Sequence, residues 1–445
     1  MTAPLARTEP NALRRGSCPS VATPMQTGDG LLVRLRPVAP ALSARDLVAI
    51  ATLAREHGNG LIEITARGNL QLRGLTEASV PRLAAGLEAA GIAPQTGVAI
   101  ETPPLAGIDP SETANAAPLA DALRRAIAEA SLVLAPKLAI VVDGGGVLCL
   151  ADMVADIRLD AAAEGTAWRL SVGGDRATAN GIGLFPAGDV IDRTMAVVAA
   201  LAANGPAARG RDLDARMLAA RLDAAVAPER LSASARHPIG SHSIGTETVL
   251  GLAPAYGQMH ADRLAALAHA LEACGATEYR LAPHRTLLAR GLEERGLAEA
   301  KRVAEREGFW SADDAPGRSI SICAGAAGCA SAAFDTRAAA DALVAHAGVL
   351  LDGSVDLHVS GCPKGCAHPA KAAVTLCGTA AGIGLVLDGR AGDPPATLLP
   401  ADTLKPAIER LGSFLLSGRR EKETAQSLLE RTAPAALVSA FQGQQ

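Results

Sequence analysis

Four cysteines in the last third of the chain have the spacing of a metal-cluster site. Cys323 and Cys329 are separated by five residues, Cys362 and Cys366 by three, and thirty-two residues lie between the two pairs. Glycines beside both pairs allow tight turns that direct amide N–H groups at cluster sulfurs. Because four cysteine thiolates are the ligand set of a [4Fe–4S] cluster, this spacing favours an iron–sulfur site.

Two alternatives for these cysteines are less favoured. A structural zinc site usually separates its paired ligands by about two to four residues, and the first pair exceeds that spacing. Disulfide bonds require an oxidising compartment. The remaining cysteines show no pairing pattern along the chain; they are Cys18, Cys149, Cys274 and Cys377.

The composition excludes several classes of protein. A chain of 445 residues is long enough for about three domains. With 42 basic and 46 acidic residues, the chain has no excess of positive charge of the kind that binds nucleic acid. No apolar run reaches the roughly 18 residues of a membrane span, and the first residues lack the apolar segment of a signal peptide. We therefore expect a cytoplasmic protein that binds neither nucleic acid nor membranes.

The elements that must position this chemistry begin with a βαββα pattern near the start of the chain. We expect a strand over residues 28–37, then a helix that begins at a capping box formed by Ser43 and Asp46 and ends at Gly58. The unit is completed by strands at 61–65 and 69–73 and a helix from 76 to 90.

The same pattern recurs in the second half of the chain, and the matching residues keep a constant offset without gaps. They are Gly28, Leu35, Pro37, Leu47, Gly58, Arg73 and Gly74 in the first copy and Gly245, Leu252, Pro254, Leu264, Gly275, Arg290 and Gly291 in the second. Two such half-domains would pack about a pseudo-twofold axis. The equivalent residues Arg67 and His284 would then face each other across a cleft, which makes the loop around each of them a candidate site.

An α/β insertion separates the two copies, and a cysteine domain follows them. The Gly-rich turn at 144–146 of the insertion lacks the spacing of a nucleotide-binding loop. In the cysteine domain, a helix over 336–348 separates the cysteine pairs, a strand delivers Cys362, and the chain after Pro400 is mostly helical. The expected divisions are a flexible tail at 1–15, the first half-domain at 16–110, the insertion at 111–240, the second half-domain at 241–310 and the iron–sulfur domain at 311–445.

Taken together, these motifs resemble the sulfite and nitrite reductases that carry siroheme and an iron–sulfur cluster, and within that family the precorrin-3B synthases. The C-x₅-C and C-x₃-C pairs match the family's cluster ligands. TARGNLQLRG matches the motif in which Arg67 reaches the substrate face of the tetrapyrrole, and LAPKLAIVVDGG places Lys137 at the first of two substrate-facing lysines. The resemblance covers nearly the entire chain and implies an α+β fold with duplicated ferredoxin-like half-domains and two α/β domains.

Departures from the reductase pattern decide between these relatives. The position of the second lysine is Ala139, and the arginine that reductases carry before the insertion has no counterpart in VAIETPPLAGIDP. Reducing a small oxyanion needs several converging cations, and part of that set is missing. Lys364 stands where reductases usually have Asn, and this residue, the following His368 and the phrases PLAG and VDGGG are similar to precorrin-3B synthases.

The resemblance therefore implies an O₂-dependent monooxygenase that hydroxylates precorrin-3A and closes a lactone to give precorrin-3B, in the aerobic cobalamin pathway. It implies a [4Fe–4S] cluster on the four cysteines and an electron donor that is a ferredoxin, a flavoprotein or NAD(P)H-linked. It also allows a mononuclear non-haem iron, with ligands among His237, His284, His358 and His368. The alternatives are a siroheme-dependent sulfite or nitrite reductase and a non-catalytic tetrapyrrole or cluster carrier.

Precorrin-3A carries carboxylate groups around its macrocycle, and proteins bind carboxylates with arginine and lysine side chains. Arg67 and Lys137 are the candidate catalytic residues. The candidate substrate-binding residues are Arg67, Gln71, Arg73, Lys137, Arg285, Lys364 and His368. Further basic residues considered for the predicted cleft are Arg176, Arg290 and Lys371, although such residues are more often solvated surface charges.

Overall fold

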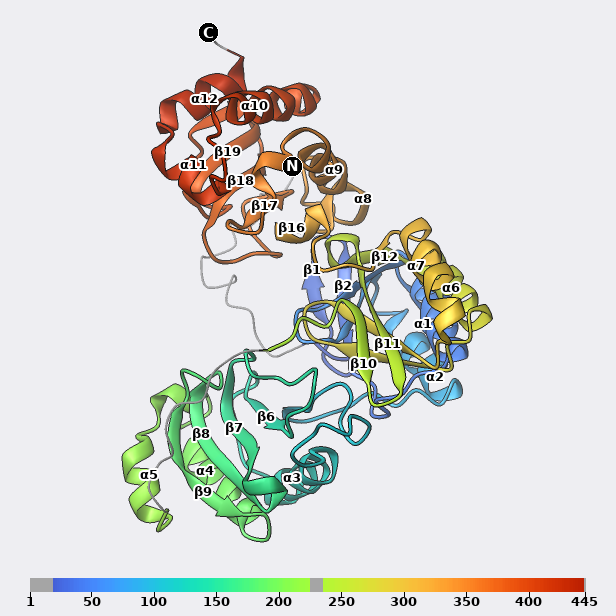
Figure 1. Ribbon diagram of the computed structural model, residues 1–445, viewed down its shortest axis with the longest axis vertical. Helices are drawn as coiled ribbons and strands as arrows, with labels where there is room; N and C mark the ends of the chain where they lie inside the picture. The colour runs from blue at the N-terminus through green and yellow to red at the C-terminus, as the bar shows by residue number, and fades with distance from the viewer. Residues whose placement is uncertain (1–18, 225–234, 444–445) are drawn as a thin grey trace, which may run out of the picture. The chain divides into compact units, whose positions relative to one another are not determined.

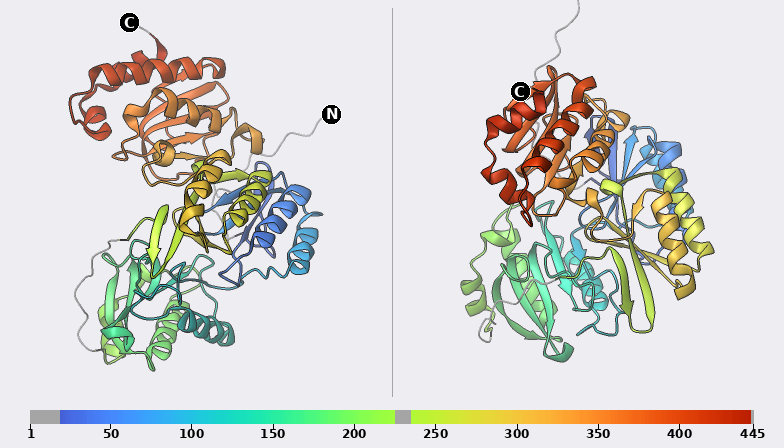
Figure 2. Two further views of the ribbon diagram at one scale, coloured as in Figure 1. Left: turned by 45° about the vertical axis from the view of Figure 1, so that its right-hand side comes forward. Right: turned by 45° about the horizontal axis from the view of Figure 1, so that its top comes forward.

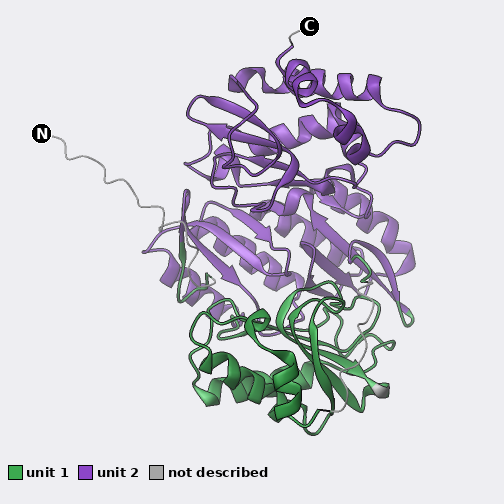
Figure 3. Ribbon diagram, turned by 90° about the vertical axis from the view of Figure 1, so that its left-hand side faces the viewer, with its two compact units in different colours: residues 1–25, 94–237, 244–246 green, residues 26–93, 238–243, 247–445 purple. Residues whose placement is uncertain are grey.

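The computed structural model describes residues 19–224 and 235–443. The chain divides into two compact units (Figure 3), one formed by residues 1–25, 94–237 and 244–246 and the other by residues 26–93, 238–243 and 247–445. We call them the insertion unit and the main unit. The tail predicted at residues 1–15 lies outside the described residues.

The first half-domain of the main unit is a five-stranded sheet with two helices. The sheet order is β1-β2-β4-β3-β12, in which β12 (Gln258–His260) comes from the second half-domain. Helix α1 has the predicted capping box, because the Ser43 side chain accepts the N–H of Asp46 and the Asp46 carboxylate accepts the N–H of Ser43. The bounds are β1 Met25–Thr27, β2 Gly30–Leu35, α1 Ala44–His57, β3 Leu61–Ile64, β4 Leu70–Leu75 and α2 Val80–Ala89.

The second half-domain repeats this arrangement. Its sheet has the order β10-β11-β14-β13, with β15 paired to β11. Figure 1 shows α1, α2, α6 and α7 grouped on one side of the two sheets. The bounds are β10 Gly240–Ile244, β11 Glu247–Pro254, β12 Gln258–His260, α6 Ala261–Ala273, β13 Glu278–Ala282, β14 Thr286–Arg290, α7 Glu294–Arg306 and β15 Phe309–Trp310.

The repeat extends to the way in which the two half-domains exchange strands. Helix α6 begins at the position equivalent to the start of α1, and β11 and β13 begin at the positions equivalent to the starts of β2 and β3. Met259 of β12 pairs with Ile62 of β3, and Leu42 bridges Tyr279 of β13. In the sequence repeat, Leu42 corresponds to Met259 and Ile62 corresponds to Tyr279, so the two pairs are equivalent. Each pair joins the segment before a helix of one half-domain to a strand of the other. Helices α1 and α6 also pack against each other, so the predicted repeat and its pseudo-twofold packing are confirmed.

The cysteine domain completes the main unit with a third sheet, of order β16-β17-β18-β19-β20. Strands β16, β17 and β18 are parallel, and β19 and β20 continue antiparallel. The predicted helix between the cysteine pairs and the helical end of the chain are confirmed, and both pack into the core of this domain. The bounds are β16 Ile320–Ile322, α8 Gly325–Gly328, α9 Thr336–His346, β17 Leu357–Ser360, β18 Ala372–Thr379, β19 Gly382–Gly389, β20 Thr397–Leu399, α10 Leu404–Gly418, α11 Ala425–Arg431 and α12 Pro434–Gln442.

The insertion unit is a separate α/β layer, visible in green in Figure 3 and from two further directions in Figure 2. Its sheet has the order β5-β6-β7-β8-β9, with β5 to β7 parallel and β7 to β9 antiparallel. Side chains alternate between the two faces of this sheet. Leu159 of β7 and Leu170 of β8 pack with α3 and α4 in the core, while Arg158 and Asp160 of β7 point to the opposite face. The bounds are β5 Ala99–Glu101, α3 Ala117–Ala130, β6 Ala139–Asp143, β7 Ala155–Ala162, β8 Ala167–Gly174, β9 Asn180–Pro186, α4 Val190–Ala203 and α5 Ala215–Arg221. A search of the described residues finds no helix that is both long and apolar enough to span a bilayer.

Candidate functional site

The four predicted cluster cysteines lie on loops that leave one edge of the third sheet. Cys323 directly follows β16, and Cys362 follows β17 by two residues. Because β16 and β17 are parallel neighbours, their carboxyl ends meet at the same edge. Cys329 directly follows α8, and Cys366 lies in the turn after Cys362.

The two cysteine loops are joined at Cys323. The N–H of Gly361 donates to Cys323 Sγ at 3.1 Å. A Cβ on Gly361 would lie 2.4 Å from a side chain of the facing loop, so this approach requires glycine. Burial raises the pKa of the Cys323 thiol; the amides of Gly361 and Gly325 oppose the rise, and the neighbouring Cys366 and Cys329 add to it. These interactions bring Cys323, Cys329 and Cys366 within electrostatic reach of one another.

The turn between β1 and β2 packs against Cys329. A Cβ on Gly28 would lie 2.5 Å from Cys329 Sγ. The next residue, Asp29, accepts two hydrogen bonds from Arg73, at 3.0 and 2.8 Å. Burial opposes the charge on Arg73, but the charges of Glu63, Asp29 and Cys329 outweigh burial and raise the pKa of Arg73. The first half-domain thus places a fixed cation beside one of the predicted cluster ligands.

The donor set suits a four-iron cluster better than a single ion. Within residues 19–224 and 235–443, no three His, Cys, Asp or Glu side chains converge closely enough to hold one metal ion. In a [4Fe–4S] cube each thiolate binds a different iron, so the four sulfurs do not need to meet at one point. Four cysteines on loops at one sheet edge fit the ligand set of such a cluster, and the amide donor to one sulfur fits its hydrogen-bonded surroundings.

Two buried side chains lie beside the cysteine loops. Burial, with Cys362 and Cys323 nearby, raises the pKa of the Cys377 thiol in β18 to about 11, so this thiol is neutral at pH 7. No spacing pattern indicates this placement of Cys377. His358 in β17 is 1% exposed, and neither of its ring nitrogens has a hydrogen-bond partner among the described residues. Burial, aided by the charge of His368, lowers the pKa of His358 to about 4, which keeps the ring neutral.

A row of polar side chains crosses four strands on the face of the first half-domain that lies away from its helices. Gln258 of β12 lies opposite Glu63 of β3. On the other side of Glu63 lies Gln71 of β4, and beyond it Arg34 of β2. Arg34 donates to Gln71 at 2.8 Å, and Gln71 donates to Glu63. Gln258 donates both to Glu63 and to the carbonyl of Ile322 at the end of β16, each at 3.3 Å. The row therefore links the sheet to the strand that carries Cys323.

Glu63 is the point at which three of the predicted binding residues meet, namely Gln71, Arg73 and Arg285. The carboxylate is buried, with 9% of the residue exposed, and lies 3.6 Å from Arg73 Nη1. Arg285 passes over Gly257, where a Cβ would lie 2.6 Å from Arg285 Cδ. Burial lowers the pKa of Arg285, and the charge of Glu63 opposes that fall. No local sequence pattern indicates Glu63, because its partners come from strands of both half-domains that pair only in the folded chain.

The equivalent loops of the two half-domains are in contact. The N–H of His284 donates to the carbonyl of Ala66 at 2.9 Å. Gly68 lies so close to the second loop that a Cβ would be 2.7 Å from the backbone of Ala282. Arg67 is half-buried at this contact. The loops predicted to face each other therefore do so, while the roles of Arg67 and His284 stay predictions.

The remaining predicted residues of the main unit lie on the second cysteine loop. Exposed Lys364 donates to Ser331 Oγ at 3.4 Å and so connects the two cysteine loops. A ring nitrogen of His368 lies 3.1 Å from the carbonyl of Lys371. Lys371 lies 3.6 Å from Asp388 in an exposed ion pair. The structure thus places Lys364 and His368 beside the cysteines.

Lys137 lies in the insertion unit, on an exposed turn directly before β6. Asp156 holds this turn, because its carboxylate accepts the N–H of Ala139 at 2.9 Å. The same carboxylate accepts two hydrogen bonds from Arg209, at 2.8 and 2.9 Å, and the N–H of Gly210 at 2.9 Å. These donors satisfy a carboxylate of which only 4% of the residue is exposed. Asp156 therefore fixes the backbone that presents Lys137.

Comparisons with known proteins assign this chain to a family. Residues 23–90 match the family model described as the nitrite/sulfite reductase ferredoxin-like half domain. The fold is similar to the solved structure of the Mycobacterium tuberculosis NirA protein, with a TM-score of 0.65 and 21% identity over 92% of this chain and 84% of that one. These matches confirm the predicted α+β fold. The chain is also 45% identical to a precorrin-3B synthase from a Sinorhizobium species over 438 residues, which cover 97% of this chain and 95% of the relative. The chain therefore belongs to the precorrin-3B synthase family of enzymes.

Proposed function

We propose that this chain is an O₂-dependent monooxygenase that converts precorrin-3A to precorrin-3B. The observation that carries the proposal is the 45% identity to a precorrin-3B synthase over 97% of the chain. In this reaction one oxygen atom of O₂ enters the macrocycle, which also closes a lactone from a ring acetate. The other oxygen atom takes up two electrons and two protons and leaves as water. A ferredoxin, a flavoprotein or an NAD(P)H-linked protein supplies the electrons.

The electron-transfer end of the proposed site is the cysteine edge of the third sheet. Cys323, Cys329, Cys362 and Cys366 would hold a [4Fe–4S] cluster, which supplies single electrons when it is bound. The amide of Gly361 at Cys323 Sγ supports this assignment, because hydrogen bonds to sulfur tune the reduction potential of such clusters. A mononuclear non-haem iron is the second centre we include. Buried His358 is the one ligand that we propose for it, because its ring is neutral and both nitrogens lack hydrogen-bond partners among the described residues. Within residues 19–224 and 235–443, no three His, Cys, Asp or Glu side chains converge on a single ion, so no further ligand is proposed.

The substrate end of the proposed site is the helix-free face of the first half-domain with its neighbouring loops. Arg67, Gln71, Arg73, Arg285, Lys364 and His368 in the main unit and Lys137 in the insertion unit are the proposed ligands of the macrocycle. Arg67 and Lys137 are the proposed catalytic residues, since fixed cations stabilise charge that develops on the reacting oxygens. The buried carboxylate of Glu63 supports the arrangement, because it holds Gln71 and Arg73 in fixed positions on the sheet.

Metal and haem analysis with EPR of the purified protein is the first test. Four irons per chain with no haem support the cluster alone, and five irons add the mononuclear centre. Siroheme in the protein, together with reduction of sulfite or nitrite, would replace our proposal with the reductase alternative. Acid-labile iron below one cluster per chain after reconstitution would contradict the assignment of the four cysteines.

Turnover of precorrin-3A with O₂ is the second test, read as the gain of one oxygen atom in the product mass. We expect Cys366→Ser to abolish turnover and the cluster EPR signal. Cys377→Ala is the matched control, because this neutral thiol lies beside the same loops and is not a proposed ligand. Binding of precorrin-3A without turnover in the fully loaded wild type would favour a non-catalytic carrier.

A further inference from the structure

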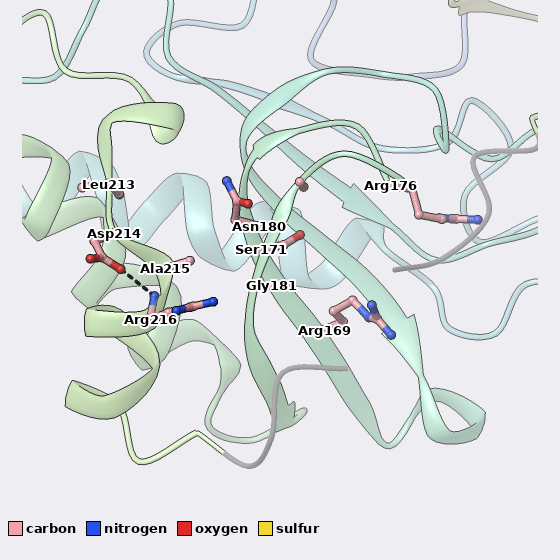
Figure 4. A pocket seen from close by; sticks show the side chains of 10 residues that line it. Arg169, Ser171, Arg176, Asn180, Gly181, Leu213, Asp214, Ala215 and Arg216 are labelled. Atoms are coloured by element: carbon pink, nitrogen blue, oxygen red, sulfur yellow. Dashed lines mark hydrogen bonds between the residues drawn. The ribbon is translucent and has the colours of Figure 1, made fainter. Parts of the chain in front are cut away.

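The insertion unit contains a pocket of about 410 Å³ whose charged side chains do not converge (Figure 4). Asp214 caps α5 by accepting the N–H of Arg216 at 2.9 Å. Arg176 donates to the buried carboxylate of Asp143 at 2.7 Å. In Figure 4 the guanidinium groups of Arg169 and Arg176 point away from Asp214 and Arg216. The described lining residues therefore do not define a ligand, and a turn of the main unit carries an inference further.

This turn joins β11 to β12, and it differs from the equivalent turn of the first half-domain. Under the offset of the repeat, residues 255–258 correspond to residues 38–41. Residues 38–41 are all exposed, and 55% of Val38 is accessible to solvent. Tyr256, in contrast, is 6% exposed and belongs to the hydrophobic core of the cysteine domain. The second half-domain therefore buries a turn that the first leaves exposed.

Helix α9 of the cysteine domain holds the buried turn. Arg337 Nη2 donates to the carbonyl of Ala255 at 3.1 Å and to the carbonyl of Gln258 at 2.8 Å. The Arg337 guanidinium lies 5.3 Å from the centroid of the Tyr256 ring, and the Tyr256 hydroxyl donates to Asp341 at 2.7 Å. Tyr256 has φ of 60°, which is uncommon for a residue with a side chain. These contacts offset the cost of that conformation.

The side-chain amide of Gln258 connects the polar row to the strand before the first cluster cysteine. Its Nε2 atom carries two N–H groups. Two acceptors lie 3.3 Å from this atom, namely Glu63 Oε1 and the carbonyl of Ile322, the residue before Cys323. Glu63 in turn accepts a hydrogen bond from Gln71. One amide thus holds both the carboxylate that orders the substrate-binding face and the backbone next to a cluster ligand.

The start of α9 holds the same cluster ligand from the other side. Thr336 Oγ1 donates to the carbonyl of Cys323 at 2.8 Å. Arg337, the next residue, binds the backbone of Gln258. The contacts therefore form a closed ring, in which α9 fixes Gln258 and Cys323 while the Gln258 amide binds the carbonyl of Ile322 between them.

We propose that Gln258 is a positioning residue for the monooxygenase reaction and acts on both ends of the site. On the substrate side it acts through Glu63, and on the cluster side it acts through the backbone of Ile322 and Cys323. This inference rests on the function proposed above and adds a residue to it. Loss of the Gln258 amide would release the carboxylate and the cysteine backbone together, although they belong to different sheets.

Gln258→Met and Gln258→Glu test the proposal in the full-length protein loaded with its cluster. Both variants keep the length of the side chain. We expect the Kd of precorrin-3A, measured by anaerobic titration, to rise about tenfold in Gln258→Met, because Glu63 loses a hydrogen bond. The rise should be larger in Gln258→Glu, where two carboxylates face each other. In both variants the EPR spectrum of the reduced cluster should change its g-values or line width, because the backbone before Cys323 loses a restraint.

Arg337→Lys is a second way to reach the same turn. It keeps a positive charge beside Tyr256 but loses the planar group that binds two carbonyls. We expect both changes in weaker form, with a Kd that rises about threefold. Urea unfolding shows which variants are folded, and Arg337→Lys decides the question if the Gln258 variants are not.

Gln442→Met is the matched control. Gln442 Nε2 donates to Thr397 Oγ1, which joins α12 to β20 in the same domain. Its loss should lower stability and leave the Kd and the EPR spectrum unchanged. Folded Gln258 variants that match the wild type at either end of the site would overturn this inference alone, as would a Gln442→Met variant that changes both ends as much as Gln258→Met does. A wild type that holds no cluster or binds no precorrin-3A would overturn the proposed function as well.

Discussion

The two half-domains have the same arrangement of strands and helices, but their helix-free faces differ. On the helix side, equivalent positions are buried and apolar or aromatic in both, as Ile62 and Tyr279 are. On the other side, the first half-domain carries Arg34, Glu63 and Gln71. The equivalent positions in the second carry Gly251, Arg280 and Leu288. Packing constrains the shared face, whereas the other face has been free to diverge, and only the first half-domain uses it for a connected polar row.

The second half-domain lacks room for such a row. A Cβ on Gly251 would lie 1.7 Å from the carbonyl of Pro238, so the returning chain covers the sheet where Arg34 stands in the first half-domain. Arg280 and Arg290 of this half-domain bind Glu278 instead, and Arg290 also binds Glu247. Arg290, a basic residue considered for the predicted cleft, is therefore part of a local ion-pair cluster. The comparison supports the first face as the one that we propose for binding the macrocycle.

The largest expected effect follows from removing the centre of the polar row. Glu63→Ala leaves Arg73 with one carboxylate partner fewer, half-buried Arg285 without the charge of Glu63, and the amides of Gln71 and Gln258 without this acceptor. We expect the free energy of unfolding to fall by about 3 to 5 kcal/mol, the usual cost of breaking a buried ion pair. Urea denaturation measures it.

Glu278→Ala is the control for this prediction in the second half-domain. Glu278 also binds two arginines, but 24% of its side chain is exposed. We expect its loss to cost about 1 kcal/mol. Equal costs at Glu63 and Glu278 would remove the energetic distinction between the two faces.

The next effect concerns the two facing loops, at the position where one has Gly68 and the other Arg285. Gly68 has φ of 72°, and a Cβ would lie 2.7 Å from the Ala282 backbone. Gly68→Ala should therefore lower the free energy of unfolding by about 2 kcal/mol, from backbone strain and a clash together. Gly91→Ala has a similar φ of 74° with nothing within 4 Å, and should cost only the strain. A smaller loss at Gly68 than at Gly91 would show that the loops do not touch in solution.

The substitution of glycine for Arg285, at the position equivalent to Gly68, should stabilise the protein. Arg285 has φ of 63°, a conformation that favours glycine, and partial burial lowers the pKa of its guanidinium group. Arg285→Gly relieves both costs, and we expect the free energy of unfolding to rise by about 1 kcal/mol while turnover of precorrin-3A falls. Arg285→Ala removes the charge and keeps the strain, so it should be less stable than Arg285→Gly. The opposite order in thermal or urea unfolding would show that the loop backbone carries no strain.

The sequence predicted what depends on local spacing. The spacing of apolar residues and the Ser43–Asp46 cap indicated the helices, because these signals come from residues close together in the chain. The constant offset between matching residues indicated the repeat. The cysteine loops were found for the same reason. The bond between Gln258 and Glu63 joins residues 195 apart in the chain, and it depends on a strand exchange that no local pattern encodes. The burial of Cys377 and His358 beside the cysteine loops likewise follows from sheet order rather than from spacing.

The smallest expected effect is a pH dependence in the second half-domain. Burial raises the pKa of Glu278, but its hydrogen bond and charge interaction with Arg280, followed by those with Arg290, outweigh burial and leave the pKa below its usual 4.5. A carboxyl group with a lowered pKa stabilises the folded state above its unfolded pKa and loses that contribution as the pH falls through the folded value. Glu278→Gln should therefore be less stable than the wild type at pH 6, by less than about 1 kcal/mol because the pair is partly exposed. The two urea midpoints should converge as the pH falls below 4.5. Midpoints that stay a constant distance apart down to the lowest pH at which the protein folds would mean that Glu278 acts through packing and not through its charge.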